Sequence, residues 1–152
     1  MKTILISACV YGEPVRWNAT SRENKEIKEW ADRNGFKLVP VCPENELFGT
    51  PRQPIRLRQS GDDVLAIMGE REVYNNLKEK CEDISQRYNN VVGFIGIANS
   101  PSCGVAAGVK GRGSTMKAPM HLALSCPTTE ISSMRSEKNR DLFLKRIKKF
   151  LT

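Results

Sequence analysis

The sequence predicts an α/β fold, in which a single domain over residues 1–152 has a mostly parallel sheet flanked by helices on both faces. Three observations support this prediction. Apolar, β-branched runs alternate with stretches of helical periodicity, which is the order that builds a parallel sheet. These runs are almost continuously apolar, as strands covered on both faces are. The length of 152 residues is that of one ordinary domain.

The first half of the chain is predicted to alternate strands with one helix. The elements are a strand over 2–8, a helix over 21–34, a strand over 36–41 and two short strands, IRLRQ and DVLAIMG, around Ser60-Gly61 in a Pro-, Arg- and Gly-rich stretch over 50–69. Ser21 is the expected N-cap of the helix, and Gly35 is expected to end it.

The second half contains the most regular helical pattern. Apolar residues recur at steps of three and four within 71–88, at Val73, Leu77, Cys81, Ile84 and Tyr88. The elements that follow are a strand over 91–97, a helix over 115–125, a short strand over 128–132 and an amphipathic helix over 135–151.

The chain is basic, with a formal net charge of +7. Lysine and arginine are spread along the sequence and become dense only at Lys145, Arg146, Lys148 and Lys149. Cations in the last turns of a helix complement its dipole, so this cluster is more typical of a solvated helix face than of a nucleic-acid patch. An interaction with RNA phosphates stays open as the alternative.

Cysteine usage predicts reduced thiols. The five cysteines are odd in number and widely spaced, unlike a disulfide framework. The N-terminus lacks the apolar run of roughly 7 to 15 residues that a secretion signal needs, and no transmembrane stretch occurs. A cytoplasmic protein without a membrane partner is expected.

Three cysteines each follow a predicted buried strand. Cys9 ends ILISAC, Cys42 ends FKLVPVC and Cys103 ends FIGIANSPSC. The carboxyl ends of parallel strands share one edge, where ligands bind in α/β proteins, so we expect the three thiols to meet. Cys81 lies on an apolar helix stripe and Cys126 precedes Pro127, and both are predicted to be structural.

The chemistry of three converging thiols has several interpretations. Buried structural cysteines are one of them, because free cysteine is among the most buried residue types and no C-x-x-C pair is present. Zinc fits less well, since the single histidine, His121, lies in a predicted helix and is expected to pack or face solvent. Three thiolates without a fourth protein ligand suit an iron-sulfur cluster with one open iron.

Polar residues accompany two of these thiols. The sequences CPE at 42–44 and SPSC at 100–103 place a carboxylate and hydroxyls beside them. Pro43 and Pro101 favour an extended preceding residue and stop each strand abruptly. Glu44 and Ser100 are therefore expected near the shared crevice.

Together these motifs resemble the small iron-sulfur desulfidases typified by thiouracil desulfurase, a family formerly of unknown function. The matching residues are Cys9-Val10-Tyr11-Gly12 leading to Arg16, Cys42-Pro43-Glu44 leading to Gly49, Pro51 and Arg52, and Ser100 to Gly104. The resemblance spans most of the chain. It departs after Arg16, where WNATSREN replaces the short aromatic-Asp-Gly turn of many relatives.

The resemblance implies a 4Fe-4S cluster held by Cys9, Cys42 and Cys103, with the fourth iron free to take the sulfur of the substrate. It also implies that Glu44 and Ser100 are catalytic. The residues predicted to contact the substrate are Arg16, Ser102 and Gly104. Such a cluster is expected to be sensitive to oxygen.

The predicted reaction is non-redox desulfuration of 2- or 4-thiouracil by water, giving uracil and hydrogen sulfide. The alternative is a tRNA or RNA thiouridine desulfidase, or an RNA-binding module that uses the basic surface. No recognisable RNA module or aromatic-rich basic stripe is present, which favours the small-molecule partner.

The segment GVKGRGST at 108–115 lacks the spacing of a phosphate-binding loop. Its glycines are expected to form a flexible wall over the active site, because glycine allows the backbone to approach a ligand closely.

Overall fold

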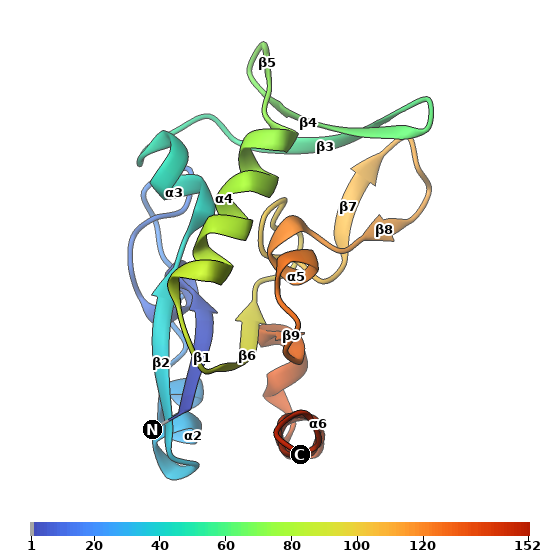
Figure 1. Ribbon diagram of the computed structural model, residues 1–152. Coiled ribbons are helices and arrows are strands. Elements are labelled where there is room, and N and C mark those ends of the chain that lie inside the picture. The colour runs from blue at the N-terminus through green and yellow to red at the C-terminus, as the bar shows by residue number, and fades with distance from the viewer. Residues whose placement is uncertain (1) are drawn as a thin grey trace.

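The computed structural model describes residues 2–152, which form two sheets with helices packed around them (Figure 1). The first sheet has four parallel strands in the order β2-β1-β6-β9. Its strands are β1 (Lys2–Ser7), β2 (Phe36–Val41), β6 (Val91–Gly96) and β9 (Thr128–Glu130). The predicted α/β fold with a mostly parallel sheet is confirmed.

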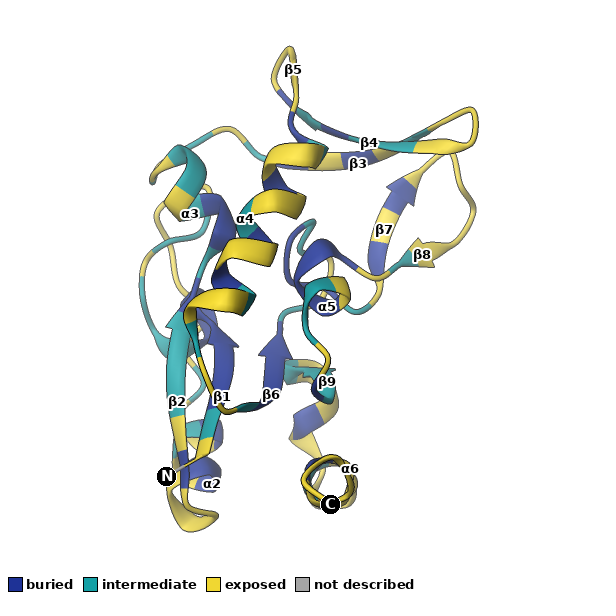
Figure 2. Ribbon diagram, viewed as in Figure 1, coloured by how far each residue is buried: buried dark blue, intermediate teal, exposed yellow. Residues whose placement is uncertain are grey.

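Helices cover both faces of this sheet. On one face, α2 (Lys25–Arg33) and α6 (Glu137–Phe150) pack against Ile4 and Ile6 of β1. On the other face, α4 (Tyr74–Arg87) and α5 (Pro119–Ala123) pack against Leu5 and Phe94. Most of β1 and β6 is therefore buried (Figure 2), which is why these strands read as continuous apolar runs.

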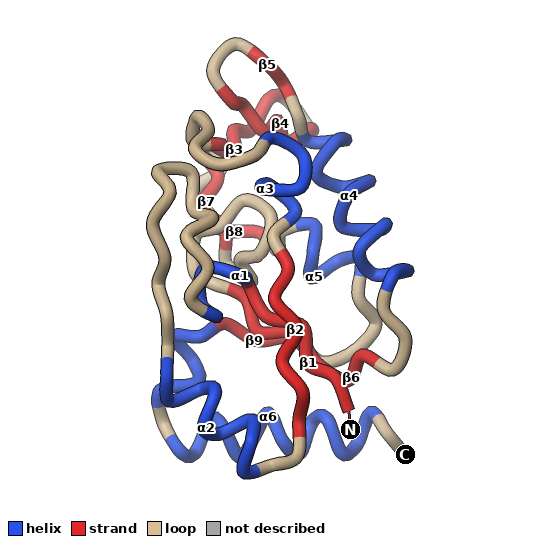
Figure 3. Tube along the Cα trace, turned by 90° about the vertical axis from the view of Figure 1, so that its left-hand side faces the viewer, coloured by secondary structure: helices blue, strands red, loops and turns tan. Residues whose placement is uncertain are grey.

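A second, five-stranded sheet lies beyond the carboxyl ends of β1, β2 and β6 (Figures 1 and 3). Its strands are β5 (Arg71–Glu72), β4 (Asp63–Met68), β3 (Ile55–Ser60), β7 (Ala107–Lys110) and β8 (Thr115–Met116), in that order. The two predicted short strands, IRLRQ and DVLAIMG, are present as β3 and β4, which pair as an antiparallel hairpin. Leu57 and Ala66 of this hairpin share a core cluster with Leu77 of α4, which ties the two sheets together.

The predicted helix over 21–34 begins later than expected. The backbone N–H groups of Arg22 and Asn24 bond to the carbonyls of Cys9 and Val10, so this segment is extended against the chain that follows β1. Asn24, rather than Ser21, is the N-cap, and its side chain accepts from the backbone of Ile27 at 3.0 Å.

The predicted helix over 115–125 is mostly wrong. Residues 115–116 pair with β7 as β8, and only residues 119–123 are helical. Pro119 lies at the start of α5, where its missing N–H is not needed. The predicted strand over 128–132 is shortened because a 3₁₀ helix, η1 (Ile131–Arg135), follows β9, and Ser136 then caps α6.

Two short helices were not predicted. Helix α1 (Ala8–Tyr11) follows β1 and α3 (Pro43–Phe48) follows β2, so both turn the chain at the same edge of the parallel sheet.

Among the helices described here, α4 and α6 have 14 residues each. Within residues 2–152, no helix combines the length and apolar character needed to span a bilayer.

Candidate active site

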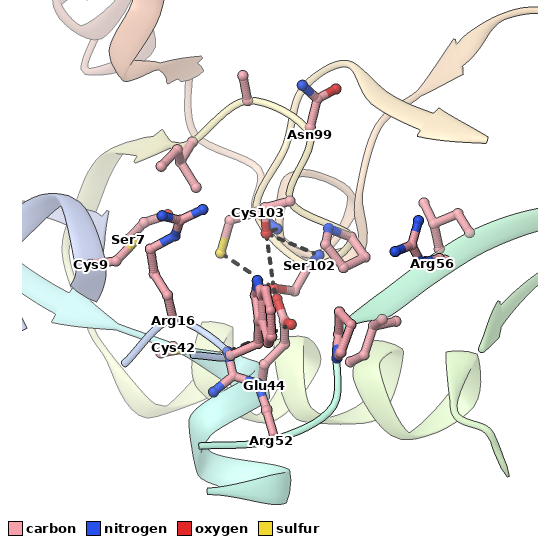
Figure 4. A pocket seen from close by; sticks show the side chains of 18 of the residues that line it. Ser7, Cys9, Arg16, Cys42, Glu44, Arg52, Arg56, Asn99, Ser102 and Cys103 are labelled. Atoms are coloured by element: carbon pink, nitrogen blue, oxygen red, sulfur yellow. Dashed lines mark hydrogen bonds and ion pairs between the residues drawn. The ribbon is translucent and has the colours of Figure 1, made fainter. Parts of the chain in front are cut away.

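A cavity of about 620 Å³ opens at the carboxyl ends of β1, β2 and β6 (Figure 4). The segments after these three strands form its floor, and residues of β3 and β7 form the opposite wall. Pockets of a few hundred Å³ are typical of small-molecule sites, and the carboxyl edge of a parallel sheet is their usual location.

The structure brings Cys9, Cys42 and Cys103 to this cavity, each from the end of a different strand. Cys9 lies in α1, Cys42 is the N-cap residue of α3, and Cys103 lies in the turn that follows β6. All three thiols are free. The expected convergence of three cysteines widely separated in sequence is therefore present.

The protonation of these thiols is set by their burial. Burial raises the pKa of Cys42 to about 11 and that of Cys103 to about 12. The pKa of Cys9 is also raised by burial, although the nearby charge of Arg16 opposes this effect. The thiols are thus protonated at neutral pH, and any metal that they bound would have to displace their protons.

The other two cysteines do not line the cavity. Cys81 is fully buried and packs with Leu5 and Phe94 in the core, as its position on the apolar stripe predicted. Cys126 is buried at a separate position after α5. Three of the five cysteines therefore line the cavity, and the other two lie outside it.

His121 supports the turn that carries Cys103. The ring is buried, and its Nε2 lies 2.7 Å from the carbonyl oxygen of Cys103. A carbonyl can only accept, so Nε2 donates, and burial lowers the pKa of His121 and keeps the ring neutral. Of the two positions expected for His121, packed or facing solvent, the structure shows the packed one.

The side chains around the cavity determine which metal ion or cluster could bind there. In the part of the chain from residue 2 to 152, no three His, Cys, Asp or Glu side chains are close enough to hold one metal ion. A cubane cluster binds its thiolates through different irons, so they stand farther apart than ligands around one ion. Three free, soft thiols around one cavity suit such a cluster better than zinc.

A buried chain of polar side chains lies beside the thiols. Ser102 Oγ donates to Glu44 Oε2 at 2.6 Å and lies 3.3 Å from Ser100 Oγ. Because the single hydroxyl hydrogen of Ser102 is used on Glu44, the Ser100 hydroxyl is the donor to Ser102. Sequence reasoning placed Glu44 and Ser100 at the site, but it did not show that Ser102 connects them.

Ser100 also shapes the loop after β6. Its Oγ accepts from the backbone N–H groups of Cys103, at 3.0 Å, and Ser102, at 3.3 Å. Its carbonyl accepts from Gly104 N at 3.0 Å. Ser100 therefore fixes the turn that presents Cys103.

Arg52 is the cation that faces Glu44. Its side chain is only 5% exposed, and Nη2 lies 3.7 Å from Glu44 Oε1. Nη1 donates to the carbonyls of Val15 and Gly49, at 2.8 and 3.0 Å. The family motif contained this arginine, but its pairing with Glu44 could not be read from the sequence.

The predicted substrate contacts fall into two groups. Arg16 and Ser102 line the cavity, together with Arg56. Gly104 does not line it. A Cβ atom at Gly104 would lie 2.9 Å from the carbonyl oxygen of Ser100, so this glycine is needed for a tight turn. Gly108 and Lys110 of β7 supply part of the wall expected from the Gly-rich segment.

We expect Gly96→Ala to destabilise the protein by about 2 kcal/mol or more, because the added methyl group overpacks a fixed site. A Cβ atom there would collide with the backbone carbonyl of Cys103 and crowd His121 Nε2. Thermal unfolding followed by circular dichroism measures the effect. Gly108→Ala is the matched control, since a Cβ atom at Gly108 meets nothing within 4 Å. Equal unfolding temperatures for the two variants would show that a Cβ atom at Gly96 does not overpack the site.

Comparisons with known proteins agree with this architecture. A family model described as 2-thiouracil desulfurase matches residues 4–131. A solved structure described as the 4Fe-4S-dependent thiouracil desulfidase TudS aligns with a TM-score of 0.70 at 20% sequence identity, covering 95% of this chain and 99% of that chain. A comparison with curated proteins gave no match. At this identity the structural alignment establishes the fold.

Proposed function

The chain belongs to the 2-thiouracil desulfurase family, and from this premise we propose that it replaces the sulfur of a thiolated pyrimidine by oxygen. The family resemblance predicted from the three sequence motifs is confirmed. In the proposed reaction, 2- or 4-thiouracil and water give uracil and hydrogen sulfide. One C=S bond becomes a C=O bond, the two hydrogens of water leave with sulfur, and no electrons are gained or lost.

The observation that carries this proposal is the convergence of three free thiols and a buried carboxylate on one cavity. Cys9, Cys42 and Cys103 would hold a 4Fe-4S cluster and leave one iron without a protein ligand. When bound, such a cluster supplies a soft Lewis acid for the sulfur of a thiocarbonyl group. The solved TudS structure, whose description names the same cofactor, supports this assignment.

Glu44 is the proposed general base. It is buried at the cavity, with one carboxylate oxygen held by Ser102 and the other facing Arg52. A carboxylate fixed on both sides is positioned to take a proton from the attacking water. Ser102 therefore serves to orient Glu44 as well as to line the substrate cavity.

Ser100 is the proposed second member of the proton path. Its hydroxyl donates toward Ser102, whose own hydroxyl donates to Glu44. Both hydroxyl hydrogens point toward the carboxylate, so a proton that reaches Ser100 is passed to Glu44 through Ser102, over a 3.3 Å contact and then a 2.6 Å hydrogen bond. To receive a proton, Ser100 Oγ must release one of the two backbone N–H groups from which it accepts, and the contact with Ser102 N, at 3.3 Å, is the longer of the two.

Arg16 supplies positive charge on the Cys9 side of the cavity. Thiolates and cluster sulfides are negatively charged, so a nearby guanidinium favours their retention. Because Arg16 also lines the open cavity, it is available to donate to the remaining carbonyl oxygen of the pyrimidine.

We expect free thiouracil to be desulfurated at least about tenfold more efficiently than thiolated tRNA, because the cavity has the size of a small-molecule site. The four basic residues Lys145, Arg146, Lys148 and Lys149 should be dispensable. They lie on α6, which is at the opposite end of the parallel sheet from the cavity (Figure 1). Release of uracil and sulfide is measured anaerobically for both substrates, with the wild type and with these four residues changed to Ala.

The second candidate is desulfuration of thiouridine in RNA. It is favoured by the exposed cations Arg56, Arg58 and Lys110, which line the same cavity and would attract phosphates. Faster turnover of tRNA than of thiouracil, together with steeply salt-dependent tRNA binding, would establish this candidate in place of the first.

A further inference from the structure

Trp17 is an exposed aromatic residue that lines the cavity. Its side chain retains 44% of its accessible surface, yet Trp17 is among the residues that line the cavity. Within residues 2–152, the remaining lining residues are aliphatic, polar or charged, so Trp17 supplies the sole aromatic face. The other tryptophan, Trp30, is buried and stacks on Phe36 in the core.

The loop that carries Trp17 is held in place by Arg52. The backbone N–H of Arg52 donates to the carbonyl of Trp17 at 2.8 Å, and its side chain donates to the carbonyl of Val15 at the same distance. The loop is closed on itself by bonds from Arg16 N to Thr20 O and from Ala19 N to Arg16 O. Trp17 is therefore presented on a fixed backbone, without the ordering cost of a mobile loop.

A planar pyrimidine has two π faces that can be recognised by stacking on an aromatic side chain. Such stacking strengthens binding roughly 5- to 100-fold for each base, whichever base is stacked. Glu44 and the three thiols supply polar and sulfur groups to the cavity, so the aromatic face of Trp17 adds a contact that they do not provide.

We propose that Trp17 positions the substrate by stacking on the pyrimidine ring. This inference rests on the proposed function and names a residue that selects its substrate class. Because the stacked ring is shared by substrate and product, Trp17 contributes to the binding of both. It acts on affinity more than on the chemical step.

The test compares Trp17→Ala, Trp17→Leu and Trp17→Phe in the cluster-loaded protein. Three quantities are measured for each variant: the dissociation constant of uracil by calorimetry, and KM and kcat with 2-thiouracil. Trp17→Ala and Trp17→Leu are expected to weaken uracil binding and raise KM by roughly 5- to 100-fold, with a smaller change in kcat. Trp17→Phe is expected to stay within about threefold of the wild type, because it keeps an aromatic face.

Leu122→Ala is the matched control. Leu122 is 61% exposed and lies outside the cavity, so its removal should change neither uracil affinity nor KM. Iron content and unfolding temperature are measured for every variant, to separate stacking from loss of the site. Wild-type affinity in Trp17→Ala, or full rescue by Trp17→Leu, would overturn the stacking proposal while leaving the proposed function intact. If the wild type neither turned over 2-thiouracil nor bound uracil, both the stacking proposal and the proposed function would be overturned.

Discussion

Replacement of any one of Cys9, Cys42 and Cys103 by Ala is expected to abolish retention of the iron-sulfur cluster and, with it, all desulfurase activity. Each thiol reaches the cavity from a different strand, so no neighbouring cysteine can take its place. Anaerobically reconstituted wild type should be brown and contain about four irons and four sulfides per chain. Iron and sulfide analysis and the visible spectrum measure the loss in each variant.

Cys81→Ala is the control for this experiment. Cys81 is fully buried but does not line the cavity, so its variant should keep the colour and iron content while losing about 1 kcal/mol of stability. Air is expected to bleach the wild type, because an iron without a protein ligand is open to oxidants. A colourless wild type after reconstitution, or loss of iron in Cys81→Ala alone, would refute the three-cysteine assignment.

Glu44→Gln is expected to lower turnover roughly 10²-fold or more while the cluster stays bound, which is the usual contribution of a positioned base. Glutamine keeps the size of the side chain and can still accept from Ser102, but it cannot take a proton at neutral pH. Single-turnover formation of uracil measures the effect. The iron content of the variant shows that the site is still assembled.

Glu46→Gln is the matched control in the same helix. Glu46 faces the surface and pairs with Arg87 at 2.6 Å, away from the residues that line the cavity. An exposed ion pair contributes little to stability, so both turnover and folding should be close to those of the wild type. Full activity of Glu44→Gln would show that another group is the base.

The proposed chemistry has a direct isotopic test on the wild type. Desulfuration in water labelled with heavy oxygen, without any reductant or electron acceptor, should give labelled uracil and an equal amount of sulfide over many turnovers. Ser100→Ala should slow this reaction, because it removes the first donor of the path to Glu44. Strict dependence on an added electron donor would show that the reaction is not hydrolytic.

The sequence by itself determined the elements whose signals are local. The strand over 36–41 was predicted with the bounds of β2, because an apolar run followed by Cys-Pro marks both its extent and its end. Helix α4 was predicted from its apolar stripe, although its start was placed too early because Arg71 and Glu72 pair with β4. The meeting of three thiols followed from a topological rule for parallel strands.

Elements whose stability depends on partners distant in the sequence could not be predicted from local sequence signals. Strands β7 and β8 are short and are joined by a turn that contains Gly111 and Gly113. They form because β7 pairs with β3, which lies about fifty residues earlier in the chain, and with β8. The helical start at Lys25 likewise depends on hydrogen bonds to the backbone of Cys9 and Val10. Local propensity could not reveal either contact.

The same division applies to the site. Motif order and strand ends were sufficient to place Glu44, Ser100 and the three cysteines at one edge of the sheet. Only the tertiary structure decided that Ser102 bonds to Glu44 across 58 residues of sequence, and that the guanidinium of Arg52 is buried beside it. The SPSC turn is held by Ser100 from within, but its contacts with His121 and with Glu44 of α3 join segments far apart in the sequence, which local propensity does not specify.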